Sequence, residues 1–245
     1  MALSHYLIAA FMLLFPYWDY WELRRLRKLK AVGVKVSFYI RTTAVLWIFT
    51  ILVLQVHPLA IYNIAPQFAI LSVKMQRFVG LGLSAIVMLL VIAPIVQLSR
   101  VSAEKRGRAL AALDKADFLI PQSANERVLF AALAISAGVC EEIICRGFFI
   151  GYFQSEPWGW SLALAVFASA ALFGMAHAGQ GWKGMISTGL AGLLFGFIYI
   201  GTGSLLLPMI VHACVDLRFL VFAMMRRSGS SDGLKALPAV ATSDR

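Results

Sequence analysis

Long apolar runs separated by short polar segments dominate the hydrophobic pattern of this chain. Each run comes near the roughly 20 residues that a helix needs to cross a hydrocarbon core about 30 Å thick. The pattern therefore predicts an all-α, polytopic transmembrane bundle, because lipid-embedded helices satisfy their own backbone hydrogen bonds. We predict seven spans, at about 3–19, 38–56, 79–98, 128–150, 158–177, 184–200 and 204–225.

The segment 57–78 is the ambiguous stretch in this pattern. It is moderately apolar, contains Pro58 and Pro66, and carries Lys74 and Arg77 near its end. Too few residues separate it from the preceding span for another full crossing. We therefore expect an external amphipathic or re-entrant segment, with an eighth span as the alternative.

Composition and the placement of charge agree with a membrane protein. The chain is 60% hydrophobic and 14% charged, and its mean hydropathy is +0.80. Basic residues gather in segments 24–35 and 100–115, and at Arg226 and Arg227 after the last span. Because cytoplasmic loops carry such positive charge, we predict an external N-terminus and a cytoplasmic C-terminus. The net charge of +10 then reflects topology, and we expect no nucleic-acid partner.

Smaller features complete the expected architecture. The first run lacks the basic leader and cleavage site of a signal peptide, and with the short loops this predicts a multi-pass protein of the inner (cytoplasmic) membrane. The segment 101–118 alternates charged residues with alanine and leucine, which predicts an amphipathic helix on the cytoplasmic surface. Gly192 and Gly196 form a GxxxG pattern that permits close helix packing.

Two adjacent glutamates, Glu141 and Glu142, lie inside the apolar run VLFAALAISAGVCEEIICRGFFIGYF. Ionisable side chains at membrane depth are costly and usually functional. Arg146 follows Glu142 by four residues, so the two can form a structural ion pair on one helical face. Glu141 lies about 100° round the helix and has no evident partner in its own span. We therefore expect Glu141 to be protonated, to meet a solvated cavity, or to meet a group from another helix.

Two later apolar runs each contribute a histidine. Phe173 and His177 share a helical face, and small residues around His177 leave room for water or a peptide. His212 and Asp216 share a face in the last span, where the carboxylate can orient the imidazole; a satisfied buried pair is the structural alternative. The span count places Glu141 and His212 mid-membrane but His177 near the cytoplasmic end of its span.

Three motifs, Glu141-Glu142-x-x-x-Arg146, Phe173-x-x-x-His177 and His212-x-x-x-Asp216, stand in this order on successive apolar helices. They resemble the motifs of the CAAX protease and bacteriocin-processing (CPBP, or Abi) family over roughly residues 125–225. The resemblance implies an intramembrane endopeptidase of the glutamate type. It implies that Glu141 is the general base on a water held with His177, that Glu142, Arg146 and Phe173 support the site, and that His212 stabilises the oxyanion. Where many members carry asparagine, Asp216 is expected to orient His212.

The resemblance, the placement of charge and the Ser-, Gly- and Ala-rich composition after Arg227 together predict how the chain is organised. We expect variable N-terminal spans with basic cytoplasmic loops in 1–127, a catalytic core of four spans in 128–227, and a disordered cytoplasmic tail in 228–245. The expected partners are the lipid bilayer and a membrane-anchored protein or peptide substrate. A prenylated C-terminal CAAX tail, a bacteriocin leader and a transmembrane sorting tail all fit, and the sequence leaves the oligomeric state open.

Two other functions compete with the glutamate protease. Glu141, His177 and His212 have the residue types of a His2Glu zinc site, although no HExxH helix is present. A non-catalytic bacteriocin-immunity or binding protein is the second alternative, because buried charges also serve binding. The main expectation is a protease without a metal or other cofactor. The cysteines, Cys140, Cys145 and Cys214, lie within spans and show no disulfide framework or CxxC metal motif.

Overall fold

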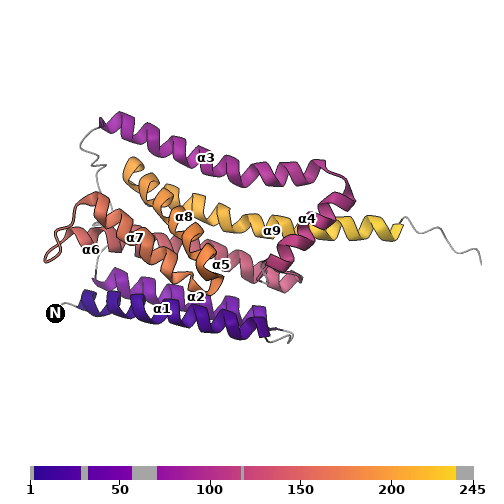
Figure 1. Ribbon diagram of the computed structural model, residues 1–245, viewed down its shortest axis with the longest axis horizontal. Helices are drawn as coiled ribbons and strands as arrows, with labels where there is room; N and C mark the ends of the chain where they lie inside the picture. Colours follow the sequence, from indigo (N-terminus) through magenta and orange to yellow (C-terminus); the bar gives the residue numbers. More distant parts are fainter. Residues whose placement is uncertain (1–2, 29–32, 57–70, 117–118, 236–245) are drawn as a thin grey trace, which may run out of the picture.

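The computed structural model describes residues 3–28, 33–56, 71–116 and 119–235. Within these ranges the chain forms helices joined by short turns, and no strand (Figure 1). The elements are α1 (Leu3–Lys28), α2 (Val34–Val56), α3 (Val73–Arg100), α4 (Ala103–Ala116), α5 (Ala124–Glu142), the π-helix η2 (Ile143–Phe149), α6 (Ile150–Gln154), α7 (Leu162–Ala176), the 3-10 helix η3 (Ala178–Gln180), α8 (Gly181–Thr202) and α9 (Leu206–Lys235). The predicted all-α class is confirmed.

Five helical stretches are long and apolar enough to cross a membrane, judged by length and composition over the described residues. They are Val34–Val56, Val73–Arg100, Ala124–Gln154, Ala178–Thr202 and Leu206–Met225. Two predicted spans, 3–19 and 158–177, are not among them: α1 is long but has a polar C-terminal part, and α7 has only 15 residues. A multi-pass membrane protein is therefore supported, while the count of seven spans and the orientation of the termini stay predictions.

Some predicted boundaries were wrong. α3 begins at Val73, capped by the Ser72 side chain, which accepts a hydrogen bond from the Met75 backbone. The last residues of the expected external segment 57–78 therefore belong to α3, because a capping serine starts the helix before the apolar run; residues 57–70 lie outside the described residues. α9 continues to Lys235, so residues 228–235 of the expected disordered tail extend a helix that is already formed, and residues 236–245 are not described.

The predicted amphipathic segment 101–118 forms α4 from Ala103 to Ala116, which confirms a helix there; residues 117–118 are not described. Its place on the cytoplasmic surface stays a prediction. α4 joins the main bundle at the same end of the molecule as the C-terminal end of α1 (Figure 1).

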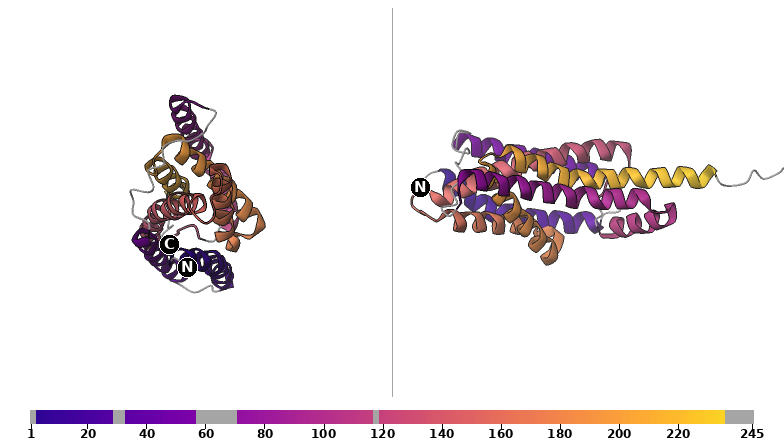
Figure 2. Two further views of the ribbon diagram at one scale, coloured as in Figure 1. Left: turned by 90° about the vertical axis from the view of Figure 1, so that its left-hand side faces the viewer. Right: turned by 90° about the horizontal axis from the view of Figure 1, so that it is seen from above.

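Helix α5, continued by η2 and α6, lies at the centre of the bundle. It packs against α2 on one side and α9 on the other, while α7 pairs with α8 and α3 covers α8 and α9 (Figure 2). The close approach of α5 and α9 depends on Gly138, where an added Cβ would lie 2.8 Å from the Ala213 backbone nitrogen. This contact brings the α5 glutamates against His212.

Candidate active site

The glutamates stand where the chain changes its helical winding. α5 is started by a capping box, in which Ser123 and Glu126 satisfy each other's backbone N–H groups. Its α-helical winding ends at Glu142, and the wider π-helix η2 follows with Arg146 at its centre. Ser169 of α7 donates a hydrogen bond of 2.5 Å to the Cys145 carbonyl in this wider turn. Single π-helical turns of this kind recur at functional sites.

Glu142 and Arg146 form the predicted ion pair. Arg146 Nη1 lies 2.8 Å from Glu142 Oε1, and the two side chains are 1% and 0% exposed. Arg146 Nη2 also donates to the Gly192 carbonyl at 2.8 Å. The guanidinium lies 4.6 Å from the centre of the Phe173 ring, within cation–π range. Arg146 therefore ties η2 to α7 and α8.

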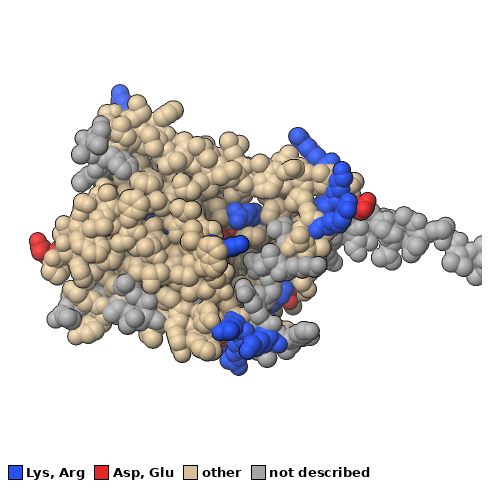
Figure 3. Space-filling view, viewed as in Figure 1, with Lys and Arg blue, Asp and Glu red and all other residues tan. Residues whose placement is uncertain are grey.

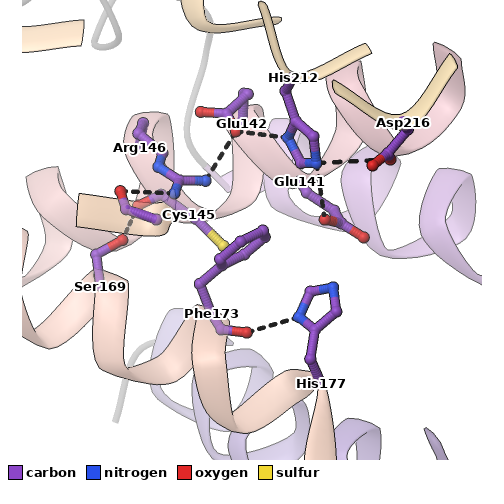
Figure 4. A network of polar contacts seen from close by, with 10 residues as sticks. Glu141, Glu142, Cys145, Arg146, Ser169, Phe173, His177, His212 and Asp216 are labelled. Atoms are coloured by element: carbon purple, nitrogen blue, oxygen red, sulfur yellow. Dashed lines mark hydrogen bonds and ion pairs between the residues drawn. The ribbon is translucent and has the colours of Figure 1, made fainter. Parts of the chain in front are cut away.

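His212 connects the ion pair to Glu141 (Figure 4). Its Nδ1 lies 2.8 Å from Glu142 Oε1. Its Nε2 lies 3.7 Å from Glu141 Oε2 and 3.8 Å from Asp216 Oδ2. The ring stacks on Phe195 with centroids 4.9 Å apart. Four side chains thus fix the position of one imidazole, with its Nε2 aimed between two carboxylates.

His177 approaches the same place from α7. It is the residue at which α7 ends, and its Nδ1 lies 2.8 Å from the Phe173 carbonyl oxygen. Because a carbonyl only accepts, Nδ1 carries the hydrogen in this bond and Nε2 is left as an acceptor. α7 ends at His177, as the predicted span 158–177 does, and the structure still brings His177 to the cavity that Glu141 lines. Their depths in the membrane stay a prediction.

Glu141 and His177 line one small cavity. Its other walls come from apolar side chains of α1, α2 and η2, among them Phe11, Phe15 and Leu46. A water-sized molecule has about 10 Å³ of free volume there, which is roughly the space that one water needs. Glu141 is 16% exposed, whereas Glu142 is fully buried and is not part of the cavity lining. The two neighbouring carboxylates therefore have different surroundings.

Neither metal-binding nor disulfide chemistry finds support among the described residues. No group of three or more His, Cys, Asp or Glu side chains there is arranged to hold a metal ion, so the zinc alternative gains no geometric support. Cys140, Cys145 and Cys214 are free thiols. Cys145 lines the small cavity beside Glu141, but it is a buried side chain that fills apolar space.

Three contributors to the site were missed by sequence reasoning. They are the Gly192 carbonyl, which accepts from Arg146, the Phe195 ring under His212, and the Ser169 hydroxyl on the Cys145 carbonyl. The GxxxG pattern pointed to Gly192, but it predicted only close helix packing and not a backbone acceptor for Arg146. Phe195 and Ser169 lie in apolar helices without any motif that points to them.

Comparison with known families addresses the same segment. Residues 123–218 match the family model described as Type II CAAX prenyl endopeptidase Rce1-like. Over this segment the chain is similar to the CAAX protease family. The CAAX-protease segment runs from the cap of α5 into α9, and contains every residue of the predicted site. A search of curated proteins and one of solved structures returned no match. The predicted resemblance is thereby confirmed, and the family is one of membrane proteases.

Proposed function

We propose that the protein is an intramembrane endopeptidase that hydrolyses a peptide bond in a membrane-anchored or lipidated substrate. The observation that carries this proposal is the water-sized cavity that Glu141 and His177 line together, with His212 Nε2 3.7 Å from Glu141. A carboxylate and an acceptor imidazole that face one water are the groups that general-base hydrolysis needs. The match to a protease family supports the same reaction.

In the proposed reaction, a water in the cavity gives one hydrogen bond to Glu141 and the other to His177 Nε2. Glu141 removes a proton as the water oxygen attacks the substrate carbonyl carbon, and the carbonyl π electrons move to oxygen. The tetrahedral intermediate then collapses, its C–N bond breaks, and Glu141 returns the proton to the leaving amine. A new carboxylate and a new amine are the products, so no cofactor is consumed.

His212 is assigned to the oxyanion. In its doubly protonated form it donates Nδ1–H to Glu142. Its Nε2–H lies beside Glu141 and is placed to donate to the substrate carbonyl oxygen, on which the negative charge develops. A positioned donor of this kind is worth about 3–4 kcal/mol of transition-state stabilisation. Glu142 and Arg146 are positioning residues, because their contacts hold the ring and do not reach the cavity. Asp216, at 3.8 Å from Nε2, helps to orient the imidazole.

The substrate class follows from the setting of the site. Apolar helices surround it, so the substrate must already be held in the membrane. Prenylated C-terminal tails, bacteriocin leaders and transmembrane sorting tails meet this condition. The prenyl endopeptidase description of the matched family model makes a prenylated tail the first substrate to test.

The deciding experiment compares cleavage of a membrane-anchored reporter with a prenylated tail by the wild type and by Glu141→Gln, at matched levels of membrane-inserted protein. We expect Glu141→Gln to abolish cleavage. Glu156→Gln, an exposed carboxylate in the turn before α7, is the matched control and should cleave like the wild type. Unchanged cleavage by Glu141→Gln would refute the mechanism, whereas no cleavage by the wild type would favour the immunity or binding function.

A further inference from the structure

A second, much larger hollow lies on the face of α1 and α2. It has a volume of about 980 Å³ and is separate from the small cavity at Glu141. Most of its length is lined by apolar and aromatic side chains, including Leu14, Trp18, Val45 and Phe49. Leu14 is 64% exposed, so the groove opens on the outside of the bundle. A lining of this kind fits a hydrocarbon chain.

One end of this groove is strongly basic. Arg24, Arg25 and Lys28, from the last turns of α1, line it there, and all three are exposed. Figure 3 shows Lys and Arg side chains gathered at this end of the molecule. No carboxylate among the described residues forms an ion pair with any of the three. Their positive charge is therefore available to a ligand.

Glu22, the acidic residue in the groove, does not repel an anion bound there. Glu22 also lines it, but its carboxylate forms an ion pair with Arg41 of α2 and its side chain is 8% exposed. Arg24 donates a hydrogen bond of 2.7 Å to the Tyr20 hydroxyl, which holds its guanidinium at the mouth of the groove. Tyr17 and Trp21, which are 65% and 52% exposed, belong to the residue types that prefer the membrane interface.

We propose that the groove binds a phospholipid with an anionic head group. Its phosphate lies against Arg24, Arg25 and Lys28, and one acyl chain follows the apolar lining past Trp18 towards Phe15. Charge placement predicts that this end of α1 faces the cytoplasm, the side on which anionic lipids attract basic segments. The shape, the apolar length and the uncompensated positive end together match this amphiphile.

The groove also touches the wall of the small cavity. Phe15 lines both hollows, and its ring stacks on Phe11 with centroids 5.3 Å apart. The end of a bound acyl chain therefore lies one aromatic ring away from the Glu141 cavity. Lipid binding needs no proteolysis, so this proposal can be tested independently of the proposed reaction.

The test uses the full chain in phosphatidylcholine vesicles that contain a minority of phosphatidylglycerol with brominated acyl chains. Bromine quenches tryptophan fluorescence on contact. The difference in quenching between the wild type and Trp18→Phe/Trp21→Phe therefore measures lipid bound in the groove. We expect the triple variant Arg24→Gln/Arg25→Gln/Lys28→Gln to weaken binding about a hundredfold, since each basic side chain near the surface contributes about fivefold. Arg24→Lys/Arg25→Lys, which keeps the charge, should bind like the wild type.

The matched control removes three positive charges elsewhere at the same end of the molecule. Lys105→Gln/Arg106→Gln/Arg108→Gln, on α4, should leave the groove-specific quenching unchanged. Equal losses in the two triple variants would show general attraction to the surface and would overturn the proposal. Brominated phosphatidylcholine, present as the same minority, should quench the wild-type groove tryptophans far less. Equal quenching by the two lipids would also overturn it, even if the triple variant failed to insert.

Discussion

Replacing Gly192 by alanine adds one methyl group against two side chains of the candidate active site, those of Phe173 and Arg146. The new Cβ would lie 2.9 Å from Phe173 Cδ1 and 3.1 Å from Arg146 Nη2. Neither side chain has room to retreat, because Phe173 is 3% and Arg146 1% exposed. The Phe173 ring also contacts the rings of His177 and His212, with centroid distances of 4.8 and 5.7 Å. A shift of Phe173 therefore moves both histidines.

Two effects of opposite sign set the change in the free energy of unfolding. Alanine is favoured over glycine in a helix interior by up to about 1 kcal/mol. Overpacking in a filled core costs about 1–3 kcal/mol, and two neighbours clash here. We expect Gly192→Ala to lower the free energy of unfolding by up to about 2 kcal/mol. Activity should fall by more than unfolding explains, because displacing catalytic groups by about 1 Å can cost 100-fold in rate.

Two glycines of the same helix supply the controls. Gly196→Ala meets only Val166 Cγ1 at 2.9 Å, so it should cost stability while each folded molecule keeps its activity. At Gly189 the nearest atom to an added Cβ is 3.6 Å away, an ordinary contact, so alanine there should be neutral or stabilising. The three purified variants are compared by thermal unfolding in detergent and by cleavage rate per folded protein. If Gly192→Ala cleaves as fast as Gly196→Ala, this packing does not position the site.

Three further predictions concern the polar network. Arg146→Ala should lower the free energy of unfolding by about 3–5 kcal/mol, because it takes the guanidinium away from the buried Glu142 carboxylate and leaves His212 as its remaining partner. Denaturant titration would contradict this if the variant were as stable as the wild type, and Glu142→Gln/Arg146→Gln should recover part of the loss. Asp216→Asn should keep most of the cleavage rate, since asparagine can still orient His212, and complete inactivity would show that the negative charge is required. Strong chelators should leave cleavage of the reporter unchanged, whereas an activity lost on chelation and restored by zinc would replace the metal-free mechanism.

Contacts within one helix were predictable from the sequence. Helical spacing alone pairs Glu142 with Arg146, and the structure gives 2.8 Å between their charged groups. The same spacing pairs His212 with Asp216, whose atoms lie 3.8 Å apart. These pairs could be found because the geometry of one helix turn does not depend on the rest of the fold.

Contacts between helices were not predictable in the same way. His212 bonds to Glu142 across 70 positions of sequence, and nothing in either run indicates which atom meets which. The predicted span 158–177 ends where α7 ends, but it begins four residues before Leu162, where the helix starts after the Ser161 cap. The all-α class and the end of α7 followed from hydropathy, but hydropathy could not show that His177 and Glu141 line one cavity.

The shortness of α7 has a consequence for which peptide bond is cut. At 1.5 Å per residue its 15 residues extend about 22 Å, less than the roughly 30 Å of a hydrocarbon core. If α7 begins at one membrane surface, His177 and the cavity lie about 8 Å beneath the other. The depth of the cavity would then select the cleavage point, because the substrate's anchor holds one particular peptide bond at that depth. Lengthening the spacer between anchor and cleavage point would move the cut along the chain by the same number of residues.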